Sequence, residues 1–155
     1  AAEVLNLHKN SLIVRITGDN ITPDGGLIDE LIYAYKRHSN IDYIGANHPE
    51  DDLPYGVNVE LFSLDSMLNA YSKAKTQYDL EHVTPWIRRH YKSRGMAEFL
   101  TNLNHEYITH DLNLTIDSPE EFNFIESLFI DIDNPVTIPW KDLCRIAFSS
   151  YKKCV

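Results

Sequence analysis

Apolar and polar positions follow two different periods along the chain, and these periods predict strands and helices in alternation. The mostly apolar runs at 12–17 and 42–46 predict strands, and the first is expected to be buried on both faces. Residues 58–62 and 112–116 alternate polar with apolar side chains, as half-buried strands do. Because helical patterns lie between these runs, the sequence predicts an α/β fold.

Five stretches repeat their apolar residues at helical spacing. Asp24 fits the N-cap of the first, and Ser118 and Glu121 form a capping box for the fourth. The third, 80–91, tolerates Pro85 only near its first turn. The side chains expected to face inward are Leu27, Leu31 and Tyr35 in the first helix, Met67, Leu68 and Tyr71 in the second (65–75), Phe122, Ile125 and Phe129 in the fourth, and Leu143, Ile146 and Ala147 in the last, which starts near Pro139.

Length and charge narrow the class of protein. The 155 residues fit a single domain, 1–155, with no second boundary. The formal net charge of -9 argues against a nucleic-acid binder, which needs a basic stripe to neutralise phosphates. No stretch has the length and hydropathy of a membrane span and no leader is found, so we expect a cytoplasmic protein without membrane contact. Cys144 and Cys154 lack metal-ligand spacing and are expected to be free thiols.

Two aspartates stand where predicted strands end. Asp19 follows the first strand, and Asp117 follows the strand at 112–116. Ligands of open α/β sheets bind at such strand ends, and Mg²⁺ typically takes one or two carboxylates together with phosphates and water. The pair could therefore hold a metal against a nucleotide. Spacing alone leaves another interpretation open, in which Asp19 is a turn residue and Asp117 an acid at a helix start.

Other charged side chains are weaker candidates on their pattern alone. Glu60 lies on an alternating strand, where a charge usually faces solvent. Glu81 and His82 stand at a helix start, where a histidine is more often a surface or capping residue than a general base. Arg88 belongs to a small basic group on a helix that could contact phosphate but more often faces solvent.

Familiar nucleotide and metal motifs are missing from the sequence. Neither a GxxxxGK[ST] loop nor a GxGxxG loop occurs. The acidic run at 50–52 lacks the spacing of a calcium loop, and His105 and His110 lack the further ligands of a zinc site. Any phosphate-cradling loop of these types would have to lie outside the chain.

Five short segments occur in a recognisable order: RITGD at 15–19, LIDELI at 27–32, PYG at 54–56 with VELF at 59–62, EHVTP at 81–85, and LTIDSPEEF at 114–122. In this order they resemble the cytidylyltransferase family that includes a spore coat polysaccharide biosynthesis protein. One segment alone would be weak, but five in order over much of the chain make the resemblance specific.

The resemblance implies a Rossmann-like three-layer nucleotidyltransferase fold. It also implies a Mg²⁺-dependent enzyme that transfers CMP from CTP to an acidic sugar, with release of pyrophosphate, for surface polysaccharide biosynthesis. By the same resemblance Asp19 and Asp117 are the catalytic, metal-holding pair. The substrate-binding residues that it implies are Thr17, Gly18, Tyr55, Gly56, Glu60, Glu81 and His82.

The resemblance carries expectations about the rest of the protein. Family members begin with a strand and an Arg- and Gly-containing loop that grips the nucleotide. No such segment is found, so the chain is expected to be the C-terminal portion, without the N-terminal nucleotide-binding part. Without that part the chain would expose sheet edges and apolar surface, which favours self-association, so a homodimer formed through the C-terminal half is also expected. The competing hypothesis is a non-catalytic sugar- or partner-binding module that kept the fold and lost the chemistry.

Overall fold

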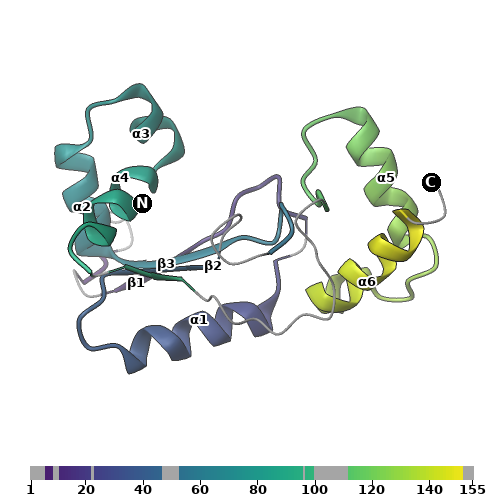
Figure 1. Cartoon of the computed structure of the whole chain (residues 1–155), viewed down its shortest axis with the longest axis horizontal. Helices are drawn as coiled ribbons and strands as arrows, with labels where there is room; N and C mark the ends of the chain where they lie inside the picture. The colour runs from purple at the N-terminus through teal and green to yellow at the C-terminus, as the bar shows by residue number, and fades with distance from the viewer. Residues whose placement is uncertain are drawn as a thin grey trace.

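A four-stranded sheet carries helices on both faces and at one end (Figure 1). The computed structural model describes residues 6–8, 11–21, 23–46, 53–95, 97–99 and 112–151. In the sheet order β1-β3-β2-β4, the pairs β1–β3 and β3–β2 are antiparallel and β2–β4 is parallel. The strands are β1 (Leu12–Arg15), β2 (Tyr43–Ala46), β3 (Val59–Ser63) and β4 (Ala97–Phe99).

The helices form three groups around the sheet. Helix α1 runs beneath it, α2, α3 and α4 gather above one end, and α5 and α6 lie together at the other end (Figure 1). A single 3₁₀ turn, Pro135–Thr137, lies between α5 and α6. The bounds are α1 Gly25–Arg37, α2 Leu64–Lys73, α3 Gln77–His82, α4 Pro85–Lys92, α5 Pro119–Phe129 and α6 Trp140–Tyr151.

The central strand β3 sorts its side chains between two cores. Successive side chains of a strand point to opposite faces of the sheet. Val59 and Leu61 accordingly join the larger core, which includes Leu27 of α1, while Phe62 joins a smaller core on the face covered by α2 and α4. Glu60 has the parity of Phe62, so the strand places its carboxylate on the α2–α4 face.

The sheet confirms the α/β class but differs from the expected one in detail. Two of the three pairings among the described strands are antiparallel, which differs from a doubly wound, parallel Rossmann-like sheet. The strand at 12–17 was expected to be buried on both faces and this is wrong: β1 lies at the edge of the sheet, with Leu12 and Val14 exposed. β3 was expected to be half-buried and is buried throughout, because helices cover both faces of this central strand.

The fourth predicted strand does not join the sheet. Residues 112–116 make only two isolated bridges, one between Asn113 and Tyr55 and one between Thr115 and Asn20. The alternation is still meaningful, because Leu112 and Leu114 are buried in the larger core.

Two helix predictions are wrong in position. Helix α2 does not face inward through Leu68 and Tyr71; the Tyr71 side chain is 84% exposed. The inward turn instead carries Ser66, whose hydroxyl contacts the Ser63 hydroxyl at 2.8 Å and donates to the Asp42 carbonyl at 3.3 Å. The single helix expected at 80–91 is two helices, α3 and α4, because Pro85 opens a new helix at its first position.

The capping predictions are confirmed. Asp24 accepts from the Leu27 amide with one carboxylate oxygen and from the Trp140 amide with the other, so it ties α1 to the start of α6. Ser118 accepts from the Glu121 amide at the start of α5. On the inner faces, Leu27, Leu31, Ile125, Leu143 and Ala147 are buried as expected, whereas Phe122 is half exposed.

Of the two cysteines, the acidic run at 50–52, His105 and His110, the structure describes only Cys144. Cys144 is a free, buried thiol, and burial raises its pKa to about 12. Cys154, the acidic run at 50–52, His105 and His110 lie outside the described residues.

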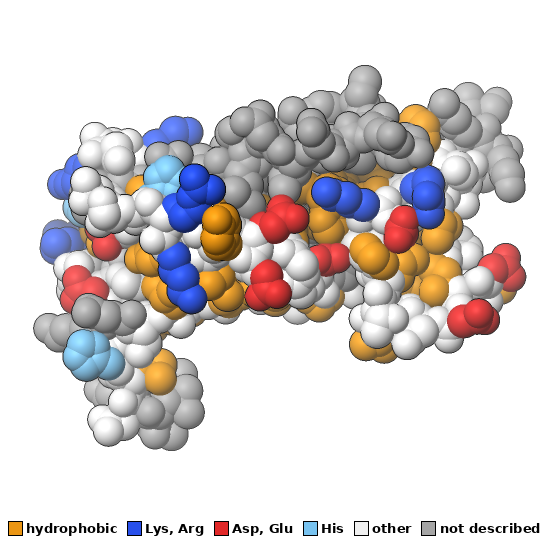
Figure 2. All heavy atoms as spheres, turned by 90° about the horizontal axis from the view of Figure 1, so that it is seen from below, with side chains coloured by type: hydrophobic (Ala, Val, Ile, Leu, Met, Phe, Trp, Pro, Cys, Tyr) orange, Lys and Arg blue, Asp and Glu red, His pale blue; other side chains and the backbone are white. Residues whose placement is uncertain are grey.

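The face beneath the sheet is mixed in charge. Figure 2 shows acidic and basic side chains interspersed over the described part of this face, without a continuous basic stripe. Apolar side chains also lie open on it. Among the described residues in and just after α5, Phe122, Ile130 and Val136 are exposed. Among the helices described, none is both long and apolar enough to cross a membrane.

Gly56 allows the Tyr55 loop to lie directly against the segment at 112–117. Its φ is +99°, and a Cβ at this position would lie 2.5 Å from the Leu114 carbonyl carbon and 2.8 Å from the Thr115 nitrogen. We expect Gly56→Ala to lower the free energy of unfolding by about 1–3 kcal/mol, because backbone atoms must move to make room. Urea denaturation measures this loss as a lower midpoint.

Gly95→Ala is the matched control. Gly95 also has a positive φ, +65°, but among the described residues no atom beyond its chain neighbours lies within 4 Å of the place of its Cβ. Its loss should therefore be limited to the left-handed backbone cost of about 1–2 kcal/mol, and the Gly56 loss should exceed it. Equal losses would show that the close approach to Leu114 contributes nothing.

Candidate functional site

A cavity of about 390 Å³ opens on the sheet face that carries Glu60. Four separate segments of the chain line it: the end of β1 and the loop after it, the loop leading into β3, the α3–α4 unit, and the segment at 112–117. Its lining is mostly polar and holds five charged side chains, which are Arg15, Asp19, Glu60, Arg88 and Asp117. A cavity of this kind is suited to a charged, hydrogen-bonding ligand.

Asp19 and Asp117 reach the cavity from adjoining segments. The Ile116 amide donates to the Asp19 carbonyl at 3.2 Å, next to the antiparallel bridge between Asn20 and Thr115. Both carboxylates line the cavity, Asp19 partly exposed and Asp117 exposed. Two residues that are distant in sequence are thus neighbours across one pair of backbone segments.

A hydrogen-bond network holds the Asp117 segment in place. The Thr115 hydroxyl contacts both the Asp117 carboxylate, at 3.2 Å, and the Asn113 amide oxygen, at 2.7 Å. Glu121 accepts from the Asp117 amide at 2.8 Å and from the Asn113 side chain at 2.7 Å. The Asp117 amide, followed by the Ser118 hydroxyl, lowers the pKa of Glu121. The capping box of α5 therefore also fixes the backbone at Asp117.

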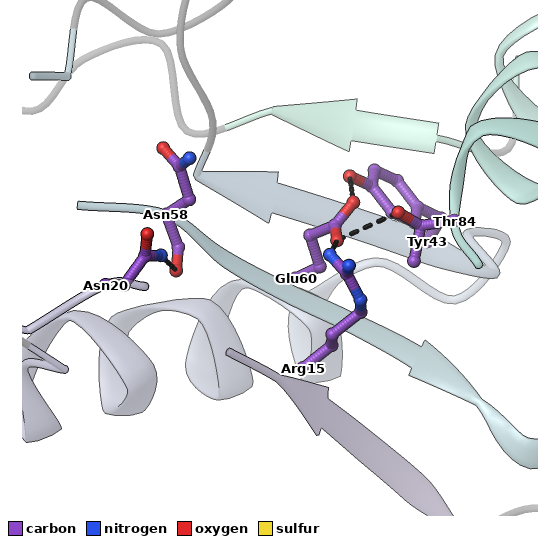
Figure 3. A network of polar contacts seen from close by, with 6 residues as sticks. All are labelled: Arg15, Asn20, Tyr43, Asn58, Glu60 and Thr84. Carbon is purple, nitrogen blue, oxygen red and sulfur yellow. Dashed lines mark hydrogen bonds and ion pairs between the residues drawn. The ribbon is translucent and has the colours of Figure 1, made fainter. Parts of the chain in front are cut away.

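Glu60 is the centre of a second polar cluster (Figure 3). Glu60 is only 4% exposed, and both of its carboxylate oxygens accept hydrogen bonds. One oxygen accepts from the Tyr43 hydroxyl at 2.8 Å, and the other accepts from Arg15 at 2.6 Å and from the Thr84 hydroxyl at 3.0 Å. The expectation that Glu60 faces solvent is wrong, because the central strand turns it inward and three donors stabilise its charge.

Helices α3 and α4 are clamped together beside this cluster. One guanidinium nitrogen of Arg89 in α4 donates to both carboxylate oxygens of the buried Asp79 in α3, at 2.7 and 2.8 Å. The Thr76 hydroxyl and then this guanidinium lower the pKa of Asp79. The clamp holds α3 and α4 together, and the bond from the Thr84 hydroxyl to Glu60 ties this unit to the sheet.

Val83 joins the two helices in a strained turn. Its φ of 68° and ψ of -55° are those of a γ-turn with positive φ, and the Thr84 amide donates to the His82 carbonyl at 2.8 Å. A β-branched residue rarely adopts this conformation. The turn leaves Thr84 without a capping bond to its own helix, and its hydroxyl reaches Glu60 instead. Strain of this kind is common at functional sites.

The structure brings together six of the nine residues that the sequence singled out. Gly18, Gly56 and Glu81 do not line the cavity. A glycine is needed at Gly56 because its backbone lies close to Leu114, and Glu81 is exposed on α3. The residues that do line the cavity are Thr17, Asp19, Tyr55, Glu60, His82 and Asp117.

Sequence reasoning missed or underrated other lining residues. Arg15 faces Glu60 in the β1–β3 register, a pairing that no local pattern reveals. Arg88 and Thr84 lie one turn apart on α4, so the helical period could have placed both on one face. The remaining residues missed are Asn20, Asn58, Tyr78, Pro85 and Thr115.

The donor set at Asp19 and Asp117 fits a magnesium ion. Within the described ranges, no group of three or more His, Cys, Asp or Glu side chains could hold a metal. Mg²⁺ commonly takes only one or two carboxylates from the protein and completes its shell with phosphates and water. Asp19 and Asp117, which line one open cavity from adjoining segments, could supply these two carboxylates.

Comparison with known proteins identifies relatives. A family model described as Cytidylyltransferase matches residues 1–152. The chain is 33% identical over 128 residues to the spore coat polysaccharide biosynthesis protein SpsF of Bacillus subtilis, covering 82% of the chain and 50% of SpsF. It is 32% identical over 116 residues to the uncharacterized protein MJ1063 of Methanocaldococcus jannaschii, covering 74% of the chain and 44% of that protein. The chain thus spans about half the length of the curated relatives it matches.

A solved structure shares the fold. The structure of a cytidylyltransferase from Leptospira borgpetersenii serovar Hardjo-bovis matches with a TM-score of 0.81 and 20% identity, over 97% of this chain and 60% of that one. The expectation that an N-terminal nucleotide-binding part is missing finds no support, because the family model matches from residue 1 to residue 152.

Removing the Glu60 carboxylate should destabilise the protein. Glu60→Ala removes one hydrogen bond from the Tyr43 hydroxyl and one from the Thr84 hydroxyl, so we expect a loss of about 1–3 kcal/mol in the free energy of unfolding. Asp142→Ala is the control, since it breaks the exposed Asp142–Arg145 pair and should cost less than about 1 kcal/mol. Similar urea midpoints for the two variants would contradict a buried, charge-centred cluster.

Relieving the turn at Val83 should have the opposite effect. Glycine accepts a positive φ without strain, so Val83→Gly should raise stability by about 1 kcal/mol after the entropic cost of glycine is subtracted. Calorimetry should show this as a melting temperature higher by about 2–4 °C. Val83→Ala keeps a Cβ and should gain less; a lower melting temperature for Val83→Gly would contradict the strained turn.

Proposed function

The chain belongs to the cytidylyltransferase family, and from this membership we propose that the protein transfers CMP from CTP to an acidic sugar and releases pyrophosphate. The observation that carries the proposal is the convergence of Asp19 and Asp117 on a polar cavity that also contains the Glu60 cluster. The activity is proposed for the protein as a whole, because the chain spans only about half of its curated relatives.

Asp19 and Asp117 would hold Mg²⁺ in this proposal. The ion would neutralise charge that develops on the phosphates and help to align them. The chain itself holds the backbone at Asp19 and orients the carboxylate of Asp117 before any ligand binds. Ile116 ties the two segments together through the Asp19 carbonyl, and Thr115 orients the Asp117 carboxylate. Preorganised groups of this kind need no rearrangement during the reaction.

The remainder of the cavity would receive the sugar. A sugar hydroxyl oxygen forms the new bond to the α-phosphorus and gives up its proton to water. The bond from that phosphorus to the bridging oxygen of the β-phosphate breaks, and pyrophosphate leaves with that oxygen. Tyr55 and His82 line the cavity with side chains that can donate hydrogen bonds to hydroxyl groups. Together with Thr17 they would orient the acceptor toward the phosphate end.

The setting of the activity is also part of the proposal. The relative from Bacillus subtilis is named for spore coat polysaccharide biosynthesis, which suggests a product used for surface polysaccharide. We place the reaction in the cytoplasm and expect a homodimer. The exposed apolar residues Phe122, Ile130 and Val136 make the α5–α6 end the proposed dimer surface.

Neutralising either aspartate should abolish turnover. We expect Asp19→Asn and Asp117→Asn each to lower kcat at least about a hundredfold, because each loses a charged ligand of the ion. Pyrophosphate release from CTP and Mg²⁺ would be followed with N-acetylneuraminate and 3-deoxy-manno-octulosonate as trial acceptors.

Asp29→Asn, on the exposed side of α1, is the control and should retain full turnover. Unchanged pyrophosphate release in either site variant would rule out the metal assignment. Acidic-sugar binding without any turnover by the unaltered protein would favour the non-catalytic binding module instead.

A further inference from the structure

Two guanidinium groups face the cavity and have no role in the function proposed above. Arg15 comes from the end of β1 and Arg88 from the face of α4 that also carries Thr84. The two residues are far apart in the sequence: Arg15 reaches the cavity from an edge strand, and Arg88 reaches it from a helix that covers the sheet. Their presence is unexpected in a chain with a formal net charge of -9.

Arg15 is fixed in place but keeps donors to spare. One guanidinium nitrogen donates to Glu60 at 2.6 Å, and its side chain remains 27% exposed. An arginine side chain has five N–H donors in a rigid, planar fork. Glu60 is the only acceptor recorded for this side chain among the described residues, so the rest of the fork is available to a ligand.

Arg88 differs from the arginine that follows it. Arg89 is occupied by the buried Asp79, in the clamp between α3 and α4. Arg88 lies about 100° around the helix from Arg89 and turns toward the cavity. In the part of the chain that the structure describes, its guanidinium has no acidic partner.

The cavity therefore has two chemically different ends. Figure 3 shows the Asn20–Asn58 contact well separated along β3 from the Arg15–Glu60–Thr84 cluster. Asp19 precedes Asn20, so the carboxylates that would hold the metal belong to the first end. The second end carries the arginines, and Glu60 compensates the charge of only one of them.

We propose that Arg15 and Arg88 form an oxyanion-binding subsite at the Glu60 end of the cavity. Resting on the proposed function, this subsite takes either the carboxylate of the acidic sugar or a phosphate of the nucleotide. Both oxyanions suit the fork geometry of arginine. Glu60 then acts as a positioning residue for Arg15, because its own oxygens already accept hydrogen bonds from Tyr43, Thr84 and Arg15.

The test measures binding, so it does not depend on turnover. Calorimetric titrations would use N-acetylneuraminate, its uncharged methyl ester, and inorganic pyrophosphate. The variants are Arg15→Met, Arg15→Lys and Arg88→Met, with Arg145→Met on the outer side of α6 as the matched control. Arg88→Met removes no recorded side-chain bond, so it remains informative if Arg15→Met disturbs folding.

For a carboxylate subsite, the acid should bind the unaltered protein at least tenfold more tightly than its ester. Arg15→Met and Arg88→Met should remove that preference, and Arg15→Lys should restore only part of it, because lysine keeps the charge but loses the fork. For a phosphate subsite, the same variants should instead weaken pyrophosphate binding at least tenfold. The Arg145 variant should match the unaltered protein.

The inference is overturned if the unaltered protein binds neither oxyanion, or if both arginine variants bind the acid and pyrophosphate as the unaltered protein does. Pyrophosphate release from CTP is measured separately. Retained release with unchanged oxyanion binding would reject the subsite and keep the proposed function, whereas selective oxyanion binding without release would do the reverse.

Discussion

Three backbone hydrogen bonds hold the segment at 112–117 against two other loops, and the candidate site depends on them. Tyr55 exchanges two of these bonds with the segment, to Leu112 and from Leu114, and the Asp19 carbonyl accepts the third from Ile116. The absence of a side chain at Gly56 permits the approach. These contacts bring the backbone of Asp117 next to that of Asp19, so the proposed metal site depends on one short stretch of backbone pairing.

The period of two along β3 has a second consequence for function. The same strand that buries Val59 and Leu61 in the larger core presents Glu60 to the cavity. A buried carboxylate is costly unless it is paired, and here Tyr43, Thr84 and Arg15 compensate it. The result is a fixed polar surface on the central strand, with Arg15 and the α3–α4 unit held in place around it.

Features that depend only on residues close together in the sequence could be predicted from it. The caps at Asp24 and Ser118 were predictable because a side-chain oxygen and an amide three residues later are all that they need. The edge position of β1 was not, because the order of strands depends on distant pairing. Neither was the burial of Glu60, whose donors come from three other elements. The ordered motifs pointed to Glu60 and to the aspartates. Arg15 opens the first motif, but its contact with Glu60 appears only in the sheet register.

The central claim is that Asp19 and Asp117 act together on one divalent ion at this cavity. A Mn²⁺ titration in the presence of CTP, followed by electron paramagnetic resonance, tests it most directly. We expect one bound ion, with an affinity at least tenfold weaker in Asp19→Asn and in Asp117→Asn. The double variant should bind the ion little worse than either single variant, because the effects of losing two ligands of one ion are not additive. Mn²⁺ binding that either single substitution leaves unchanged would contradict it.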